Sequence, residues 1–255
     1  MNILVCVKHI PDHIARINPQ KNGIELSDSV KYRMNRFDEY AVEEAVVIKE
    51  RNPETTINVV TIGPERAESV VRRAMGMGAD NGFMAITDPD EYKSPSEISR
   101  ILAEIARKSQ YDLIFTGIMS EDQMNAQTGQ MLAAHLDIPC VCGVVGISFI
   151  NAGNIRVERE REGGVRESLI VRMPAVLTIQ SGINQPRYPA LSAILRANSK
   201  KLEIFNHAQA LSEKDQTVVY VKPSEKLRQG KILEGSTAEK AKQLIEIFKE
   251  RNALI

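Results

Sequence analysis

A polar stretch, "GIMSEDQMNAQTGQ" from Gly117 to Gln130, lies between an apolar run and an amphipathic helical pattern. A helix that begins near Ala126 presents unpaired backbone N–H groups at its start, and such groups bind a phosphate readily. Thr128 could add a hydroxyl donor. The stretch has neither the pattern of a P-loop nor the three spaced glycines of a dinucleotide fingerprint. Two interpretations therefore stay open for the isolated loop: Asn125 and Thr128 cap a helix, or the loop binds a nucleotide.

Other side chains that carry catalysis or bind metals are sparse. The histidines lack partners at metal-ligand spacing; they are His9, His13, His135 and His207. No serine occupies a nucleophile elbow, and no acidic pair stands out from ordinary surface carboxylates. This pattern favours binding or carrying over catalysis by side chains, although an enzyme that relies on a cofactor would lack such groups as well.

The three cysteines, Cys6, Cys140 and Cys142, lie inside apolar runs. An odd number of cysteines fits a reducing compartment better than a disulfide framework. Cys140 and Cys142 face the same side of a predicted strand, but no second pair of ligands accompanies them. We expect packed, inert thiols at this position rather than a metal site.

Composition excludes several classes of protein. The 255 residues suffice for one sizeable core, and the 43% hydrophobic content is ordinary for a globular protein. The 33 basic and 33 acidic residues cancel, which makes nucleic acid a poor partner. The apolar stretches of about ten residues are too short for a transmembrane helix. No targeting signal is visible, so we expect a cytoplasmic protein.

Strand and helix patterns alternate over residues 1–145. Continuous apolar runs predict parallel strands covered on both faces; they span residues 2–7, 57–63, 82–87, 112–117 and 140–147. Helical patterns separate them, at residues 38–51, 64–80 and 94–110. This alternation predicts an α/β fold with a doubly wound, mostly parallel sheet and right-handed crossovers.

Helix boundaries are predicted from local signals. Asp38 is expected to cap the first helix, with Glu43 and Glu44 on its solvent side. Ser94 or Ser96 is expected to cap the third. Glycines after Met75 are expected to end the second.

The pattern changes after Ile147. Segments 153–162, 165–173 and 174–182 are typical of strands joined by turns, and predict an antiparallel extension of the sheet. We expect residues 1–205 to form the α/β domain, and residues 206–255 to form a linker and a C-terminal helical arm. Ser236 or Thr237 would cap the arm's helix. Its apolar stripe could pack on its own core or on another chain.

Three loops follow the predicted parallel strands at their carboxyl ends. They are the loop after "VCVKHIPD", the segment "RMNRFDEYAVEEA" and the stretch from Gly117. In the usual strand order these loops converge between the first and fourth strands, at the topological switch point where α/β sheets bind ligands. A nucleotide is the natural occupant.

Several motifs in one order resemble the β (small) subunit family of electron transfer flavoproteins. They include "VKHIPD", "MNRFDEYAVEEAVVIKE", "AMGMGAD", the "AQTGQM" loop, "VEREREGGVRESLIVRMPAVLT" and "NQPRYPALSAILRA". The similarity runs from about Ile3 to Lys201. Its most specific part, from Val157 to Thr178, corresponds to the identifying signature of the family.

The resemblance implies a heterodimer whose α subunit carries FAD, while β holds an AMP of structural role. It implies an electron carrier rather than a classical enzyme. This carrier would shuttle electrons from acyl-CoA dehydrogenase-type flavoenzymes of fatty acid oxidation to a respiratory acceptor. The nucleotide pocket would comprise Cys6, Asn35, Arg36, Phe37, Asp38, Ile62, Gly117, Asp122, Asn125, Ala126, Gln127 and Thr128.

The resemblance also implies a partner-docking loop, in which Leu191 is the apolar anchor and Tyr188, Pro189 and Ile194 contribute. The pattern alone favours an amphipathic helix in which Leu191, Ile194 and Leu195 pack on the protein's own core, and the resemblance reverses this preference for Leu191 only. Glu160 matches a carboxylate that positions the flavin domain of the α subunit, although it could be a solvated strand residue.

One departure from the family pattern leaves an alternative. Ala126 before "QTG" is similar to electron-bifurcating relatives, in which β holds a second FAD and NADH is oxidised, which would be flavin-based oxidoreductase activity. Thr128 and the bulky Gln123 and Met124 favour AMP. A more distant alternative is a stand-alone, stress-protein-like nucleotide-binding regulator, which would leave residues 157–197 unexplained.

Overall fold

The computed structural model describes residues 1–12, 30–88, 92–205, 230 and 232–251, and the backbone of residues 17–20 and 23–26. The chain divides into two compact units, Met1–Val221 and Lys222–Ile255, and each is described by itself. The linker expected from residue 206 onward falls largely on residues 206–229, outside the described residues, so its predicted boundary stays a prediction.

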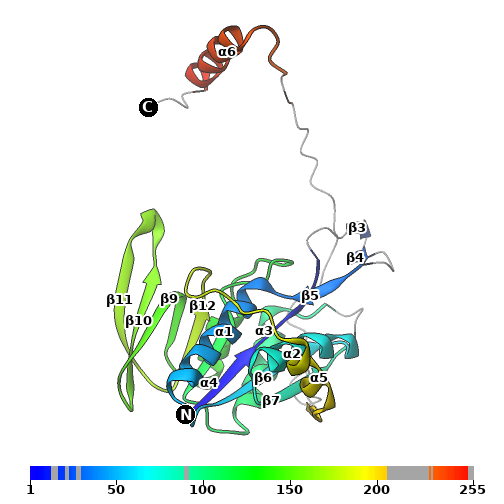
Figure 1. Ribbon diagram of the computed structural model, residues 1–255, viewed down its shortest axis with the longest axis vertical. Coiled ribbons are helices and arrows are strands. Elements are labelled where there is room, and N and C mark those ends of the chain that lie inside the picture. Colours follow the sequence, from blue (N-terminus) through cyan, green and yellow to red (C-terminus); the bar gives the residue numbers. More distant parts are fainter. Residues whose placement is uncertain are drawn as a thin grey trace. The chain divides into compact units, whose positions relative to one another are not determined.

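Within the described part of the first unit, nine strands form one sheet in the order β11-β10-β9-β12-β8-β1-β6-β7-β13 (Figure 1). Their bounds are β1 (Asn2–Cys6), β6 (Thr56–Gly63), β7 (Asn81–Ile86), β8 (Leu113–Gly117), β9 (Cys140–Asn151), β10 (Asn154–Glu160), β11 (Arg166–Arg172), β12 (Ala175–Ile179) and β13 (Glu203–Phe205). Every neighbouring pair in the run β9-β12-β8-β1-β6-β7-β13 is parallel. The predicted doubly wound α/β class is confirmed.

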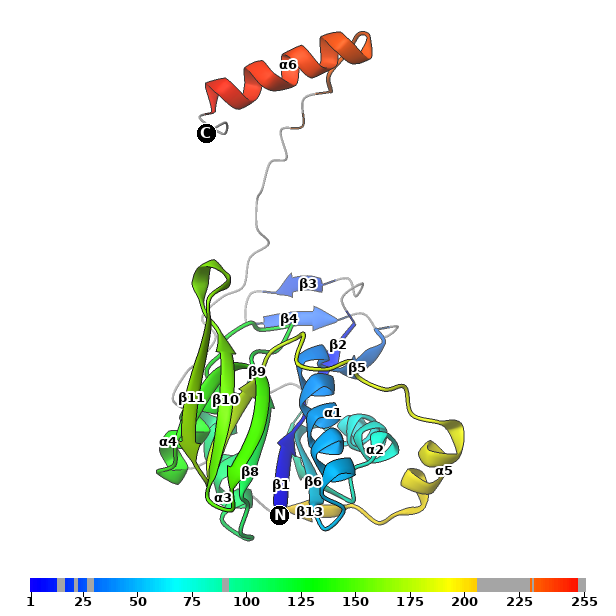
Figure 2. The ribbon, with the colours of Figure 1, turned by 60° about the vertical axis from the view of Figure 1, so that its left-hand side comes forward.

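Helices cover both faces of this sheet (Figures 1 and 2). Their bounds are α1 (Arg36–Arg51), the 3₁₀ turn η1 (Glu65–Ala67), α2 (Glu68–Met77), α3 (Pro95–Ala106), α4 (Thr128–Leu136) and α5 (Leu191–Ser199). Ile3 and Val5 pack in the core cluster of α1 and α2. Leu4 and Cys6 pack with α3 and α4. Because side chains alternate along a strand, β1 is buried on both faces, as its continuous apolar run predicts.

The signals for the second and third helices are confirmed. The Ser94 side chain accepts the backbone N–H of Glu97, and the Glu97 carboxylate accepts the backbone N–H of Ser94, which completes a capping box. Gly78 ends α2 with a φ of 138°, a conformation that glycine adopts without a Cβ clash.

The expectation for the first helix is wrong in two respects. Asn35 is the N-cap residue, and Asp38 lies inside the first turn of α1 because backbone N–H groups of other segments engage its carboxylate. Glu43 and Glu44 are buried rather than solvent-facing. Their partners are Arg187 and Asn184, which lie far along the chain.

The antiparallel extension is confirmed for two strands only. β10 pairs antiparallel with both β9 and β11. The strand β12, in contrast, runs parallel between β8 and β9. All five of its residues are buried, and such continuous burial is typical of an interior parallel strand.

Two short antiparallel pairs lie outside this sheet: β2 (His9–Pro11) with β5 (Tyr32–Met34), and β3 (Ile17–Gln20) with β4 (Gly23–Leu26). The described part of the second unit contains the predicted C-terminal helix, α6 (Thr237–Glu250). Ser236 caps it in a full capping box with Glu239. Leu244, Ile245 and Phe248 stay exposed.

Candidate functional site

The reversal of strand order lies between β1 and β8. From β1 the chain adds β6 and β7 on one side, and then crosses to β8 on the other side. At such a switch point the two crossovers leave in opposite directions and open a crevice at the carboxyl ends of the strands. Cys6 ends β1 and Gly117 ends β8, so the loops that follow these strands border the candidate site.

Asp38 joins three of the bordering segments. Its Oδ2 accepts the backbone N–H of Lys8 at 2.7 Å, and its Oδ1 accepts that of Gly117 at 3.0 Å. Burial raises the pKa of the Asp38 carboxyl to about 7, against the hydrogen bonds from Asn35, Lys8 and Gly117, which lower it. A Cβ at Gly117 would lie 2.4 Å from Asp38 Oδ1, so this position requires glycine.

Asn35 holds the polar stretch against the start of α1. Its side chain is buried, donates from Nδ2 to the carbonyl of Met119 at 2.9 Å, and accepts the backbone N–H of Glu121 at 3.2 Å. Glu121 in turn accepts the backbone N–H of Arg36 at 3.1 Å. Both polar atoms of the buried amide are therefore satisfied, and the loop has a defined path.

Two ion pairs fix the same loop. Lys8 Nζ lies 2.8 Å from Asp122 Oδ2 and donates to Ser120 Oγ at 3.2 Å. Arg33 Nη2 lies 2.9 Å from Glu121 Oε2. Sequence reasoning placed Asp122 in the site but missed Lys8, although Lys8 follows the first strand directly in "VKHIPD". A cation that immediately follows a switch-point strand is the signal that could have found it.

Helix α4 begins with an open amino terminus. Gln127 is its N-cap residue and makes no capping hydrogen bond through its side chain. Met124 and Ala126 have φ values of 53° and 51°, which are uncommon for residues other than glycine. Gly129 lies against the sheet, because a Cβ there would come within 2.5 Å of Thr178 Cγ2. The exposed backbone before α4 can therefore direct N–H groups toward an anion.

The remaining predicted nucleotide residues surround this arrangement. Cys6 is buried at the end of β1, and Ile62 is partly buried near the end of β6, the neighbouring strand. Phe37 is partly buried and its Cβ lies beside Gly117. Asn125 is exposed in the loop. The structure thus ties residues 35–38 directly to residues 117–122, while Cys6 and Ile62 lie on adjacent strands.

A second feature anchors the predicted docking loop to α1. Arg187 donates from Nε to Glu43 Oε2 at 2.9 Å and from Nη2 to Glu43 Oε1 at 2.8 Å, and its backbone N–H reaches Oε2 at 3.0 Å. Its Nη1 reaches Glu50 at 2.6 Å. Asn184 donates to Glu44 Oε2 and to the carbonyl of Tyr40, both at 3.0 Å. Two buried carboxylates therefore hold the loop.

The predicted docking residues divide into two groups. Tyr188 is 82% exposed and Leu191 is 72% exposed. Pro189 is buried and Ile194 is partly buried, and both lie against Gly76 of α2. The loop thus presents Tyr188 and Leu191 on the surface, while Pro189 and Ile194 pack it onto the protein. Glu160 is exposed at the end of β10.

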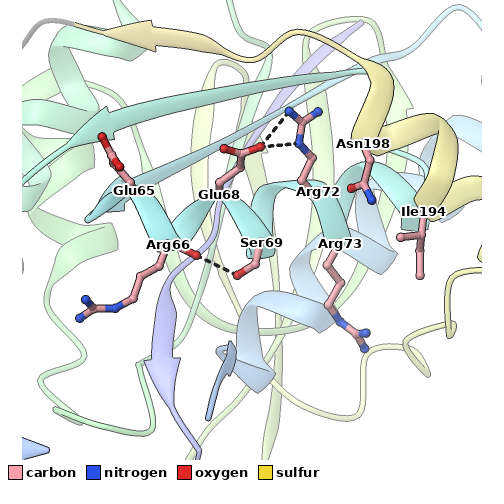
Figure 3. Close-up of a pocket in the computed structure, with 8 residues that line it drawn as sticks. All are labelled: Glu65, Arg66, Glu68, Ser69, Arg72, Arg73, Ile194 and Asn198. Carbon is pink, nitrogen blue, oxygen red and sulfur yellow. Dashed lines mark hydrogen bonds and ion pairs between the residues drawn. The ribbon is translucent and has the colours of Figure 1, made fainter. Parts of the chain in front are cut away.

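A pocket of about 470 Å³ adjoins this loop (Figure 3). It is lined by Glu65, Arg66, Glu68, Ser69, Arg72, Arg73, Ile194 and Asn198. Figure 3 shows that six of these side chains come from η1 and α2, while Ile194 and Asn198 come from the neighbouring helix α5. Arg72 pairs with Glu68 and Arg73 with Glu39, each at 2.9 Å. None of the predicted nucleotide residues lines the pocket, so it is separate from the switch-point site.

The described residues contain no group of three or more His, Cys, Asp and Glu side chains that could hold a metal ion. His9 stacks on Tyr32 at 4.6 Å, and burial lowers the pKa of His9 to about 4. His13 and His207 lie outside the described residues. Among the helices that the structure describes, none has the length and apolar character needed to span a bilayer.

Comparison with known proteins identifies the family of this chain. A family model described as electron transfer flavoprotein domain matches residues 25–210. The electron transfer flavoprotein subunit beta of Bacillus subtilis is 34% identical over 266 residues, which cover 100% of both chains. This chain belongs to the electron transfer flavoprotein β-subunit family.

Other members of the family have similar sequence identity to this chain. The human electron transfer flavoprotein subunit beta is 36% identical over 208 residues, 80% of each chain. The Methylophilus methylotrophus subunit beta is 33% identical over 260 residues, 98% of each chain. The family match includes residues 157–197, the segment that a stress-protein-like regulator would leave unexplained.

Proposed function

We propose that this chain is the β subunit of an electron transfer flavoprotein heterodimer, that its α subunit carries FAD, and that its own switch-point site binds AMP. Membership of the β-subunit family supports the pairing with an α subunit. The open amino terminus of α4, preceded by Met124 and Ala126 in left-handed conformations, is the observation that carries the nucleotide site.

The residues at the switch point fit an adenosine monophosphate. Ala126, Gln127 and Thr128 would hold the phosphate, since backbone N–H groups at a helix start favour an anion. Cys6 and Ile62 would border the base from the ends of β1 and β6. Asp38 and Asn35 would act indirectly, because their hydrogen bonds shape the loop between β8 and α4.

AMP at this site has a structural role, and the FAD of the α subunit supplies the redox chemistry when bound. The residues of this chain would bind the AMP, dock the electron donor and orient the α subunit. Leu191 and Tyr188 would contact an acyl-CoA dehydrogenase-type flavoenzyme, and electrons would pass on to a respiratory acceptor. The carrier itself would be cytoplasmic. Small contacts suit a carrier that must release its partners. Glu160 would help to position the flavin domain of α.

The C-terminal arm would complete the heterodimer. Helix α6 exposes Leu244, Ile245 and Phe248, and Phe248 follows the other two by four and three residues, which places them on one helical face. Burial of such an apolar stripe stabilises the assembly by about 25 cal/mol for each Å² of apolar surface removed from water. We infer that α6 packs on the α subunit.

The experiment is to purify the heterodimer, denature it, and measure the released nucleotides. The proposal predicts one FAD and one AMP for each heterodimer. Two FAD per heterodimer, together with NADH oxidation, would support the electron-bifurcating alternative, for which Ala126 is the favouring residue. A colourless chain that associates only with itself and releases no flavin would contradict the heterodimer.

A further inference from the structure

The two thiols on β9 form a close pair. Cys140 and Cys142 are separated by one residue on the same strand, and their Sγ atoms lie 3.9 Å apart. A disulfide needs an S–S distance of about 2 Å, so the two side chains must rotate before the sulfurs reach bonding distance. Both thiols are partly buried, whereas Cys6 is buried.

The backbone around Cys142 departs from regular pairing. Cys142 lies opposite Thr178 on β12, and the register then shifts so that Ile179 pairs with Val144. Gly143 is the extra residue, with a φ of 72°, and its N–H donates to Thr178 Oγ1 at 3.2 Å. A bulge of this type redirects the side chains beside it.

The surroundings of the pair favour one thiolate. The pKa of Cys142 is lowered, first by the hydrogen bond with Cys140, and further by Thr178 and the Arg159 guanidinium. The pKa of Cys140 is raised by its hydrogen bond with Cys142 and by burial. Burial also raises the pKa of Cys6, and the neighbouring Asp38 raises it further. The thiolate is the reactive form of a cysteine, so we expect the thiol near Arg159 and Thr178, Cys142, to react first.

We propose that Cys140 and Cys142 are a redox-active dithiol, which hydroperoxides oxidise reversibly to an intramolecular disulfide. The Cys142 thiolate attacks one peroxide oxygen, an S–O bond forms, and the O–O bond breaks. The departing alkoxide or hydroxide takes up a proton, which leaves a sulfenic acid on Cys142.

The second step uses the neighbouring thiol. Cys140 loses its proton and its sulfur attacks the Cys142 sulfur, so that the S–S bond forms while the S–O bond breaks. The hydroxide that leaves takes up the proton and becomes water. In sum, two thiols and one hydroperoxide give one disulfide, one alcohol and one water, and a dithiol reductant reverses the change.

The test uses the full-length protein in its folded state, treated with hydrogen peroxide and then with an alkylating agent. We expect Cys140 and Cys142 to become protected together, peptide mass spectrometry to find them linked, and dithiothreitol to restore both. The double variant Cys140→Ser with Cys142→Ser is the matched control and should show neither peroxide-dependent protection nor a linked peptide. Irreversible sulfinic acid on Cys142, or oxidation of Cys6 before the pair, would overturn the proposal.

Two single variants assign the roles. Cys140→Ser should retain a sulfenic acid on Cys142 that dimedone traps, whereas Cys142→Ser should give no dimedone adduct on Cys140. Phenylarsine oxide tests the pair without an oxidant, because one arsenic atom bridges two neighbouring thiols. It should block alkylation of the pair in the unmutated protein and in neither of these two variants. Independent alkylation of both thiols in its presence would show that they do not act as a pair.

Discussion

The carboxylate of Asp38 accepts the backbone N–H of Gly117 at 3.0 Å, and thereby joins the first turn of α1 to the end of β8. Its second oxygen accepts the N–H of Lys8, which follows β1. One buried side chain therefore links the two strands that flank the switch point. The candidate nucleotide site depends on this link, because the loop that leads to α4 starts at Gly117.

Asp38→Asn should weaken both the fold and the site. An amide offers one oxygen, so one of the two backbone N–H groups would face an NH₂ group instead of an acceptor. An unsatisfied buried donor costs about 1–3 kcal/mol. Urea unfolding above pH 7, where the carboxyl is ionised and both of its oxygens accept, should show this loss, and the purified variant should retain less nucleotide. Glu162→Gln, which changes an exposed carboxylate, is the control; equal stabilities of the two variants would contradict the role of Asp38.

The same carboxyl should make stability depend on pH. Its folded pKa of about 7 lies above the ordinary value of 3.8. Between these values the folded state binds more protons than the unfolded state, so the contribution of Asp38 to stability falls as pH rises. The free energy of unfolding of the natural protein, relative to Asp38→Asn, should therefore decrease by up to about 1.4 kcal/mol for each pH unit in this window. A difference that increases with pH would contradict the raised pKa.

Arg187 and Glu43 should be strongly coupled. Glu43 is 4% exposed, and Arg187→Ala would leave its charge without its main partner. Breaking a fully buried pair from one side costs about 3–5 kcal/mol. The loss here should be smaller, because the Arg187 side chain is 36% exposed. Glu43→Gln in the same chain should recover part of that loss, with a coupling energy of about 0.5–3 kcal/mol in a double-mutant cycle. A coupling near zero would contradict the anchoring of the docking loop.

The pair of Arg73 with Glu39 is the matched control for this cycle, because its arginine is similarly exposed while its carboxylate is less buried than that of Glu43. Arg73→Ala and Glu39→Gln should couple by about 0–1 kcal/mol, since solvent screens both partners. The difference between the two coupling energies shows how much of the Arg187–Glu43 coupling depends on burial of the carboxylate.

Gly129→Ala should displace the start of α4. The added methyl group would lie 2.5 Å from Thr178 Cγ2 and 2.9 Å from Thr116 Oγ1. Overpacking of this kind costs about 1–3 kcal/mol, and it should reduce nucleotide retention as well. Gly153→Ala is the control, because a Cβ there meets only Asn151 Oδ1, at 3.8 Å. Thermal unfolding at equal or higher temperature for Gly129→Ala would contradict the tight packing.

Leu191→Ala should separate docking from folding. Its side chain is exposed, so truncation should change the free energy of unfolding by no more than about 0.5 kcal/mol. If Leu191 is the docking anchor, the KM for an acyl-CoA dehydrogenase-type donor should rise by about tenfold or more. Leu195→Ala, which truncates another exposed leucine of α5, should leave that KM unchanged. Equal effects of the two variants would remove the special role of Leu191.

Much of the architecture followed from local patterns. Continuous apolar runs predicted the parallel strands, and local signals predicted caps at Ser94 or Ser96 and at Ser236 or Thr237, of which the structure has Ser94 and Ser236. These features depend on hydrogen bonds and burial within one segment, so neighbouring residues contain the information. The switch point between β1 and β8 followed from the order of such segments and from the handedness of crossovers.

The tertiary structure decided where long-range partners meet. Asp38 and Glu43 have the residue types of a cap and of a solvated helix face, and both are buried because Gly117 and Arg187 reach them from distant parts of the chain. The position of β12 between β8 and β9 is equally non-local. A sequence pattern shows that a carboxylate or a strand is present. Only the folded chain shows which donors pair with that carboxylate and which strands lie beside that strand, since both depend on packing between segments far apart in sequence.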